Sequence, residues 1–63
     1  MYTETIRQYE ARVQYEYILN EQEPDVEIMG MSYPAGTALR MLDNVAFEEL
    51  MFDYFDSIEV EIT

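Results

Sequence analysis

The chain has 63 residues, and its 14 Asp and Glu against 3 Lys and Arg give a formal net charge of −11 at pH 7. Binding to nucleic acids or to anionic membranes relies on Lys and Arg that neutralise phosphates, so this charge argues against both partners. Hydrophobic residues make up 49% of the chain and aromatic residues 14%, which is too apolar for intrinsic disorder. We therefore expect one folded domain over residues 1–63.

Size and composition also limit how such a fold is stabilised. A core in a domain of about 60 residues is marginal on its own, and this sequence has neither Cys nor His. Disulfides and thiolate metal sites are excluded, and the commonest general base is missing. Self-association is the remaining support, so we expect a homodimer. The N-terminus lacks the residue order of a signal peptide and no apolar run approaches a membrane span, which predicts a cytoplasmic protein.

Alternating apolar and polar residues predict a first strand over about residues 8 to 19, because period 2 with Tyr and Val is typical of a half-buried strand. Its apolar positions are Tyr9, Ala11, Val13, Tyr15, Tyr17 and Leu19. The polar segment 20–25 contains Pro24 and predicts a turn. Val26 and Ile28 then resume the alternation and predict a second, antiparallel strand that forms a hairpin with the first.

Helical signals follow. Thr37, after Pro34 and Gly36, is a suitable cap for a short helix that ends near residue 42. Asp43 or Asn44 can cap the main helix, predicted over residues 45–56. Its positions i, i+3, i+4 and i+7 hold Phe47, Leu50, Met51 and Tyr54. Alternation over residues 58–62 predicts the last strand. The expected fold is α+β, a three-stranded antiparallel sheet in the order strand, strand, helix, strand, with one main helix.

Carboxylates are the only abundant titratable side chains, so an enzyme would have to use them as acid, base or metal ligand. Glu48 with Asp53, or Glu59 with Glu61, are the pairs one can nominate. No segment has the spacing of a calcium loop, and no Gly-rich phosphate cradle is present. We therefore expect no catalysis, no metal and no cofactor. Taken singly, each acid is explained as part of a solvated face that maintains solubility.

The distribution of the acids is more informative than any pair. Residues 41 to 63 contain no base and seven acids, which are Asp43, Glu48, Glu49, Asp53, Asp56, Glu59 and Glu61. Such an uncompensated surface repels itself, which suggests that it binds something positive. The DNA-binding grooves of proteins are positive surfaces, and a row of carboxylates can imitate duplex phosphates there. The alternative is an acidic protein with no such target.

The main helix also carries more apolar groups than a small sheet can cover. A second stripe of Met41, Val45 and Phe52 lies nearly opposite the first if the helix is continuous. This stripe packs against a second copy of the chain or anchors a partner, because large aromatics are common hot-spot residues. The predicted partner-binding residues are Phe47, Glu48, Glu49, Leu50, Met51, Phe52, Asp53 and Tyr54. Ordinary core packing explains each aromatic taken alone.

Two short segments resemble a known family. Phe47-Glu48-Glu49-Leu50 is similar to the Phe-Glu-x-Leu motif of the small acidic uracil-DNA glycosylase inhibitors encoded by phages that infect Bacillus, and Tyr15-Glu16-Tyr17 is similar to their Tyr-Glu-Tyr segment. The resemblance implies the strand, strand, helix, strand order and a homodimeric DNA mimic acting in the host cell. It further implies that Phe47 enters the enzyme's pocket for an extruded base, beside Glu48 as a phosphate-like acid.

Three functions follow from these patterns. The favoured one is a DNA-mimicking protein inhibitor that blocks the DNA-binding groove of uracil-DNA glycosylase. The second is an inhibitor of another DNA-acting protein, such as a restriction or CRISPR nuclease or RNA polymerase. The third is an acidic dimerising scaffold with no inhibitory role. The patterns leave open whether Phe47 or Phe52 is the exposed anchor, because Phe52 takes that role if Phe47 lies in the core.

Overall fold

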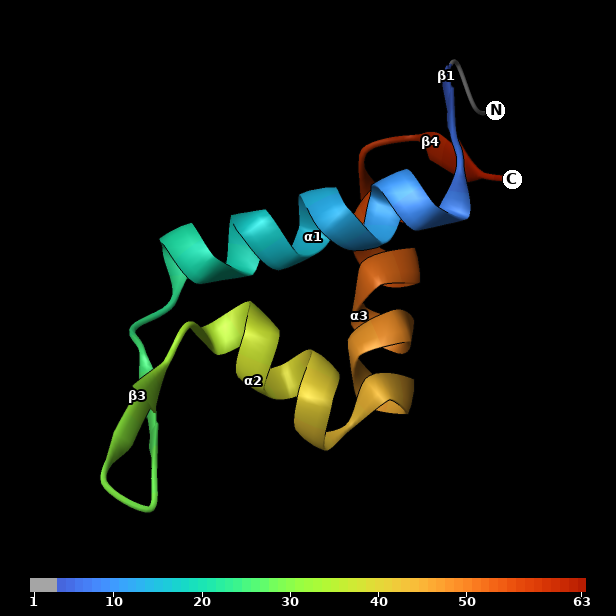
Figure 1. The fold of residues 1–63 in the computed structure, drawn as a ribbon. Coiled ribbons are helices and arrows are strands. Elements are labelled where there is room, and N and C mark those ends of the chain that lie inside the picture. Colours follow the sequence, from blue (N-terminus) through green and yellow to red (C-terminus); the bar gives the residue numbers. More distant parts are fainter. Residues whose placement is uncertain (1–3) are drawn as a thin grey trace.

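Three helices and four short strands make up residues 4–63, which are the residues that the computed structural model describes (Figure 1). The elements in chain order are β1 (Glu4–Ile6), α1 (Gln8–Gln22), β2 (Val26–Ile28), β3 (Met31–Tyr33), α2 (Ala35–Leu42), α3 (Asn44–Ser57) and β4 (Val60–Ile62). The predicted α+β class is confirmed. The predicted three-stranded sheet is wrong, since the described strands form two separate two-stranded sheets. The prediction of one main helix is also wrong, because α1 has 15 residues and α3 has 14.

The segment predicted as the first strand is helix α1, for two physical reasons. Its 15 residues exceed the usual length of a strand, and they include no Gly or Pro. The apolar alternation also contains a helical stripe, because Ala11, Tyr15 and Leu19 recur at i, i+4 and i+8 and pack into the core. The other members of the alternation, Tyr9, Val13 and Tyr17, lie exposed on α1.

The hairpin forms between β2 and β3 instead, with Val26 opposite Tyr33 and Ile28 opposite Met31. Its loop is Met29-Gly30, and both residues have positive φ, 52° and 81°. Positive φ at both loop residues is the requirement of a type I′ turn, which favours Asn-Gly and gives the twist that antiparallel strands need. A methionine in this left-handed region costs about 1–2 kcal/mol. Of the predicted turn at residues 20–25, residues 20–22 belong to α1, and only residues 23–25 connect that helix to β2.

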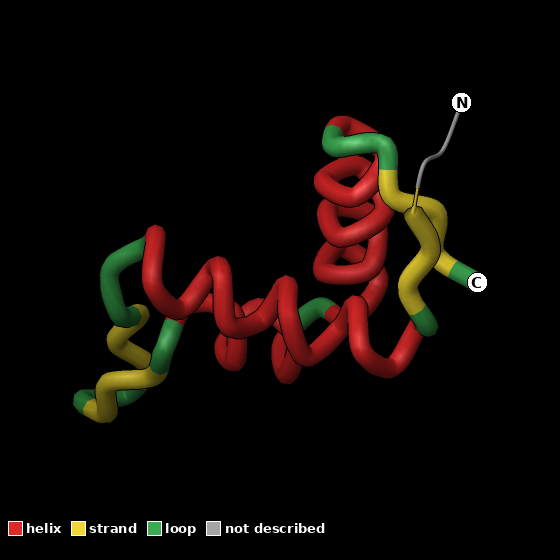
Figure 2. The backbone as a smooth tube through the Cα atoms, turned by 90° about the horizontal axis from the view of Figure 1, so that it is seen from above, coloured by secondary structure: helices red, strands yellow, loops and turns green. Residues whose placement is uncertain are grey.

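Strand β4 was predicted, whereas β1 was not. The two strands pair in parallel, with Glu4 opposite Val60 and Ile6 opposite Ile62. They lie at the end of the molecule away from the hairpin (Figures 1 and 2). Ile6 and Ile62 pack against the core, so the pair fixes the two ends of the described chain to the same cluster.

Both predicted helices are confirmed, as α2 and α3. The Asp43 carboxylate accepts a hydrogen bond from the backbone N–H of Ala46 at 3.0 Å, as expected of a cap for α3. Thr37 lies within α2 and is not its cap. The first turn of α2 is instead capped by α1, because Asn20 Oδ1 accepts hydrogen bonds from the backbone N–H groups of Gly36 at 2.7 Å and Thr37 at 3.2 Å.

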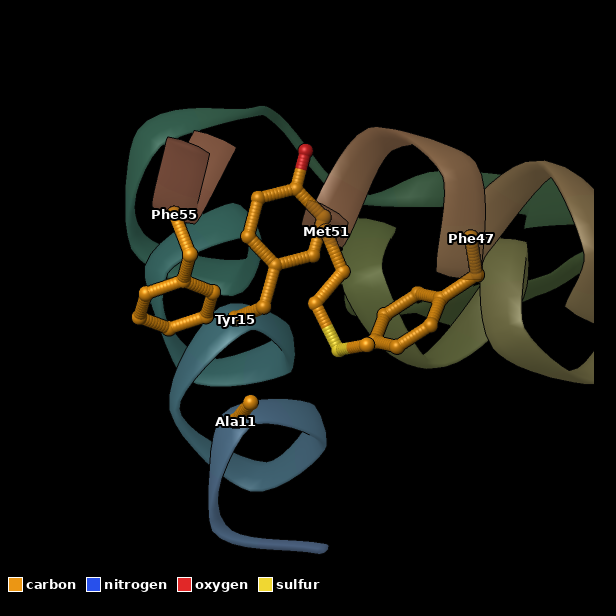
Figure 3. Packing of buried hydrophobic residues seen from close by; sticks show 5 residues of the cluster. All are labelled: Ala11, Tyr15, Phe47, Met51 and Phe55. Atoms are coloured by element: carbon orange, nitrogen blue, oxygen red, sulfur yellow. The ribbon is translucent and has the colours of Figure 1, made fainter. Parts of the chain in front are cut away.

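A small aromatic core lies between α1 and α3 (Figure 3). Its buried members are Ala11, Tyr15, Phe47, Met51 and Phe55. The rings of Tyr15 and Phe47 meet edge to face, with centroids 5.5 Å apart and planes at 66°, which is a favourable aromatic geometry. Phe47 and Met51 are the only large side chains fully buried in the described chain, so stability depends on few contacts.

The molecule is elongated, with principal extents of 44 × 19 × 15 Å. Its radius of gyration of 12.6 Å exceeds the roughly 11 Å expected for a compact domain of this length. The hairpin connects α1 to α2 and lies at the end of the molecule away from β1 and β4 (Figures 1 and 2). Much of the apolar surface on and beside the hairpin therefore stays exposed.

Candidate functional site on helix α3

Helix α3 carries all of the predicted partner-binding residues, and the structure divides them between two faces. Phe47 and Met51 are 0% exposed, and Phe55 joins them on the inner face against α1. The sequence left open whether Phe47 or Phe52 is the exposed anchor, and in the folded chain Phe47 is buried. The physical reason is the spacing, because positions i, i+4 and i+8 of α3 line up opposite Ala11 and Tyr15 of α1.

The opposite side of α3 is exposed and acidic. Its residues, called here the outer face of α3, are Val45, Glu49, Phe52, Asp53 and Asp56. The acids recur at i, i+4 and i+7, so they form one row along the helix. Phe52 is 43% and Val45 is 68% exposed beside this row. A large ring thus lies next to carboxylates on a face that no part of the described core covers.

Leu50 and Tyr54 lie between the two faces. Leu50 is 46% exposed, while Tyr54 is half-buried and packs its ring against Tyr15 and Phe55 at centroid distances of 5.5 Å and 5.2 Å. The role of Tyr54 in the folded chain is therefore packing. Leu50 remains at the margin of the exposed surface.

Glu48 is removed from the acidic surface by an ion pair. Arg12 of α1 donates from both Nε and Nη2 to Glu48 Oε1, with the Nε contact at 2.8 Å. Arg40 of α2 similarly pairs with Glu16 of α1 at 2.7 Å. Both acids are half-buried where helices meet. Two of the three arginines thus pair with acids where helices meet, whereas Glu49 and Asp53 lie exposed on the outer face of α3.

Burial and nearby charges shift the pKa values of two side chains of α1, Tyr15 and Glu16. Burial raises the pKa of the Tyr15 hydroxyl, and the nearby negative charge of Asp53 raises it further. At Glu16, burial favours the neutral form, but hydrogen bonds from Thr37 at 2.6 Å and from Arg40 outweigh it and lower the pKa. The pKa of Tyr15 is thus raised mainly by burial, with a further contribution from a nearby acid, whereas the pKa of Glu16 is lowered by local pairing.

A cleft of about 660 Å³ lies outside the predicted site, near the paired strands β1 and β4. Its lining includes Arg7, Glu10 and Phe55. The sequence patterns missed it because they did not predict β1, whose three residues carry no clear alternation.

Within residues 4–63, no group of three or more Asp and Glu side chains is placed to hold a metal ion. The described helices also include none with the length and hydropathy needed to cross a membrane. Comparisons of the chain with protein-family models, with curated proteins and with solved structures find no match.

Proposed function

We propose that the chain is a DNA-mimicking protein inhibitor that occupies the positively charged groove of a DNA-binding enzyme. The single observation that carries the proposal is the outer face of α3, where a row of exposed acids lies beside the exposed ring of Phe52. The resemblance in the helix motif makes uracil-DNA glycosylase the first target to test.

Charge spacing supports imitation of a nucleic-acid strand. With a rise of about 1.5 Å per residue, the carboxylates of Glu49, Asp53 and Asp56 are separated along the helix axis by about 6 Å and then about 4.5 Å. One DNA strand carries a charge about every 3.4 Å. The row therefore covers the length of about three nucleotides. A basic groove attracts such a row from a distance, and this steering accelerates association at low salt.

Phe52 supplies the apolar anchor of the proposed site. Enzymes that act on a base extrude it into an apolar, stacking pocket, and an exposed ring flanked by acids fits such a pocket and the phosphate sites around it. Phe52 replaces Phe47 in this role because Phe47 has no exposed surface. Inhibition then requires occupancy alone, without bond making by the inhibitor.

The test is inhibition of purified uracil-DNA glycosylase in a uracil-excision assay. Phe52→Ala is expected to weaken inhibition by about 30-fold or more, as for a hot-spot aromatic. The matched control is Val13→Ala, since Val13 is 68% exposed on α1, and this variant should inhibit like the parent chain. Equal potency of Phe52→Ala and the parent chain would contradict the proposed anchor.

The acidic row is tested separately from the ring. Asp53→Asn should slow association with the enzyme at low salt, because it removes one charge from the steering field. Glu10→Gln removes an equal charge from the exposed surface of α1 and is expected to have a smaller effect. If the two substitutions change the association rate equally, only net charge matters and the row has no special role.

A further inference from the structure

The β2–β3 hairpin has one apolar face and one polar face. Along a strand, successive side chains point to opposite faces, and residues opposite each other on paired strands share a face. Val26, Ile28, Met31 and Tyr33 therefore share one face, while Glu27 and Ser32 lie on the other. The apolar face is only partly covered, since Val26 is 38% and Met31 is 60% exposed.

An apolar pocket of about 150 Å³ opens between this face and helix α2. It is lined by Ile28, Tyr33, Ala38, Met41 and Leu42. Small-molecule sites usually measure about 300–1,000 Å³, so this pocket is too small for a typical ligand. Its size and apolar lining suit one unbranched hydrophobic side chain.

Met29 is such a side chain, and its placement is unusual in two respects. It is 98% exposed, at the tip of the hairpin and next in sequence to Ile28 in the pocket wall. It also has a φ of 52°, in a turn position where Asn, Asp or Gly is favoured. A methionine that is both strained and fully exposed contributes nothing to the isolated fold. Strained residues of this kind often mark binding positions.

We infer that Met29 of one copy inserts into the hairpin–α2 pocket of a second copy, and that the second copy returns the same contact. A two-fold dimer requires each surface to be complementary to itself, and a projecting side chain next to an empty pocket meets this condition. Methionine suits such a contact because its flexible thioether fills irregular gaps.

Charge and size favour a second copy as the occupant. Each chain carries −11, so any interface between copies must keep acids away from each other. The apolar hairpin face has no charged residue, and Glu27 points to its other side. The small core and the extended shape also leave this end of the molecule with little support, and oligomerisation is a usual means of stabilising a chain this short.

The inference is tested by sedimentation equilibrium of the chain alone, over a range of concentration and salt. The parent chain should reach twice its 7.5 kDa mass. Added salt should strengthen the dimer, because it screens repulsion between acidic copies. Salt should weaken the complex with a basic enzyme, so the dimer and the inhibitor proposal fail independently. A parent chain that stays monomeric at every concentration would overturn the inference.

Met29→Asn is the decisive variant, because Asn suits the type I′ turn while it removes the apolar side chain. The dissociation constant of the dimer should rise by about 100-fold or more, since two symmetric apolar contacts are lost. The melting temperature of the monomer should not fall. Val13→Gln, which changes an exposed residue on α1, should leave the dimer intact. A Met29→Asn chain that dimerises like the parent would refute the contact.

A mixture of two variants tests the reciprocal geometry. Leu42→Gln makes the pocket wall polar and should also give monomers. When it is mixed with Met29→Asn, the Met29 of the Leu42→Gln chain can enter the unaltered pocket of the other chain. The mixture should therefore form heterodimers that are weaker than the parent dimer, whereas each variant by itself should stay monomeric. Absence of any heterodimer would contradict the paired contacts.

Discussion

Arg12 on α1 donates a hydrogen bond from Nε to Oε1 of Glu48 on α3 at 2.8 Å, and thereby joins the two helices that enclose the core. The same pair decides which acids remain available for binding. Glu48 was predicted to act as a phosphate-like acid, but its charge is neutralised within the fold. Glu49 and Asp53, the other acids predicted to bind a partner, lie exposed on the outer face of α3.

Glu48→Gln therefore tests a structural role against a binding role. Because both partners are partly exposed, the loss of the ion pair should lower the free energy of unfolding by no more than about 1 kcal/mol. Inhibition of the glycosylase should be unchanged. Chemical denaturation and the uracil-excision assay measure the two effects, and a loss of inhibition with unchanged stability would place Glu48 in the binding surface instead.

Phe47→Ala should destabilise the fold strongly. The side chain is fully buried against Tyr15, and truncation of a buried Phe costs about 3–5 kcal/mol. For a domain of this size that is a large part of the total stability. Thermal unfolding followed by circular dichroism measures the loss. Phe52→Ala is the control, since Phe52 is 43% exposed and its truncation should lower the melting temperature far less.

Gly36→Ala should destabilise the packing of α2 on α1. A Cβ at this position would lie 2.5 Å from the backbone oxygen of Glu16 and 2.8 Å from Asn20 Oδ1. A backbone atom cannot move aside as a flexible side chain can, so the helices must separate, at a cost of about 1–3 kcal/mol. Alanine is otherwise the better helix former. Increased stability of Gly36→Ala in denaturant would therefore contradict the close approach of the two helices.

The ion pair of Glu16 predicts a specific pH dependence. Hydrogen bonds from Thr37 and Arg40 hold the pKa of Glu16 below its ordinary value of 4.5 in the folded chain. Its contribution to stability is thus present above pH 4.5 and is lost as the pH falls through the lower, folded-state pKa. Protonation of the other acids relieves repulsion and acts in the opposite direction, so the difference between variants is the useful quantity.

The comparison of the parent chain with Glu16→Gln isolates this contribution. The parent should be the more stable of the two near neutral pH, and the difference should shrink in acid below pH 4.5. Glu10→Gln removes a charge from the exposed side of α1 without removing those hydrogen bonds, and it should not reproduce this profile. A Glu16→Gln difference that does not vary with pH would show that the pairing contributes nothing.

The strand predicted over about residues 8 to 19 was wrong because the pattern of these residues fits both a strand and a helix. The apolar alternation from Tyr9 to Leu19 suits a strand. It is also compatible with a helix, in which Ala11, Tyr15 and Leu19 form the inner stripe and the remaining apolar residues are exposed. Length decides between them, since 15 residues suit a helix. The main helix was predictable because its spacing fits only a helix and its Asp43 cap is a strong local signal.

The candidate site was predictable only in part, for a related reason. The acid-rich segment of α3 and its helical spacing follow from the sequence, but the predicted second stripe is interrupted, because Met41 lies on α2 and only Val45 and Phe52 lie on α3. Which stripe is buried depends on what packs against α3, and the structure places helix α1 there, not a sheet. Phe47 is therefore buried and Phe52 exposed. Strand β1 and its parallel pairing with β4 could not be foreseen, since its three residues pair with a segment at the far end of the chain.

The most direct test of the proposed function is the affinity of the chain for purified uracil-DNA glycosylase, measured in rising salt with a uracil-containing duplex as competitor. The proposal requires a complex at low salt that weakens as salt is added and that excludes the duplex. Phe52→Ala should weaken this complex by about 30-fold or more, and Val13→Ala should leave it unchanged. The absence of a complex at low salt, or a complex insensitive to both salt and Phe52→Ala, would contradict the proposal.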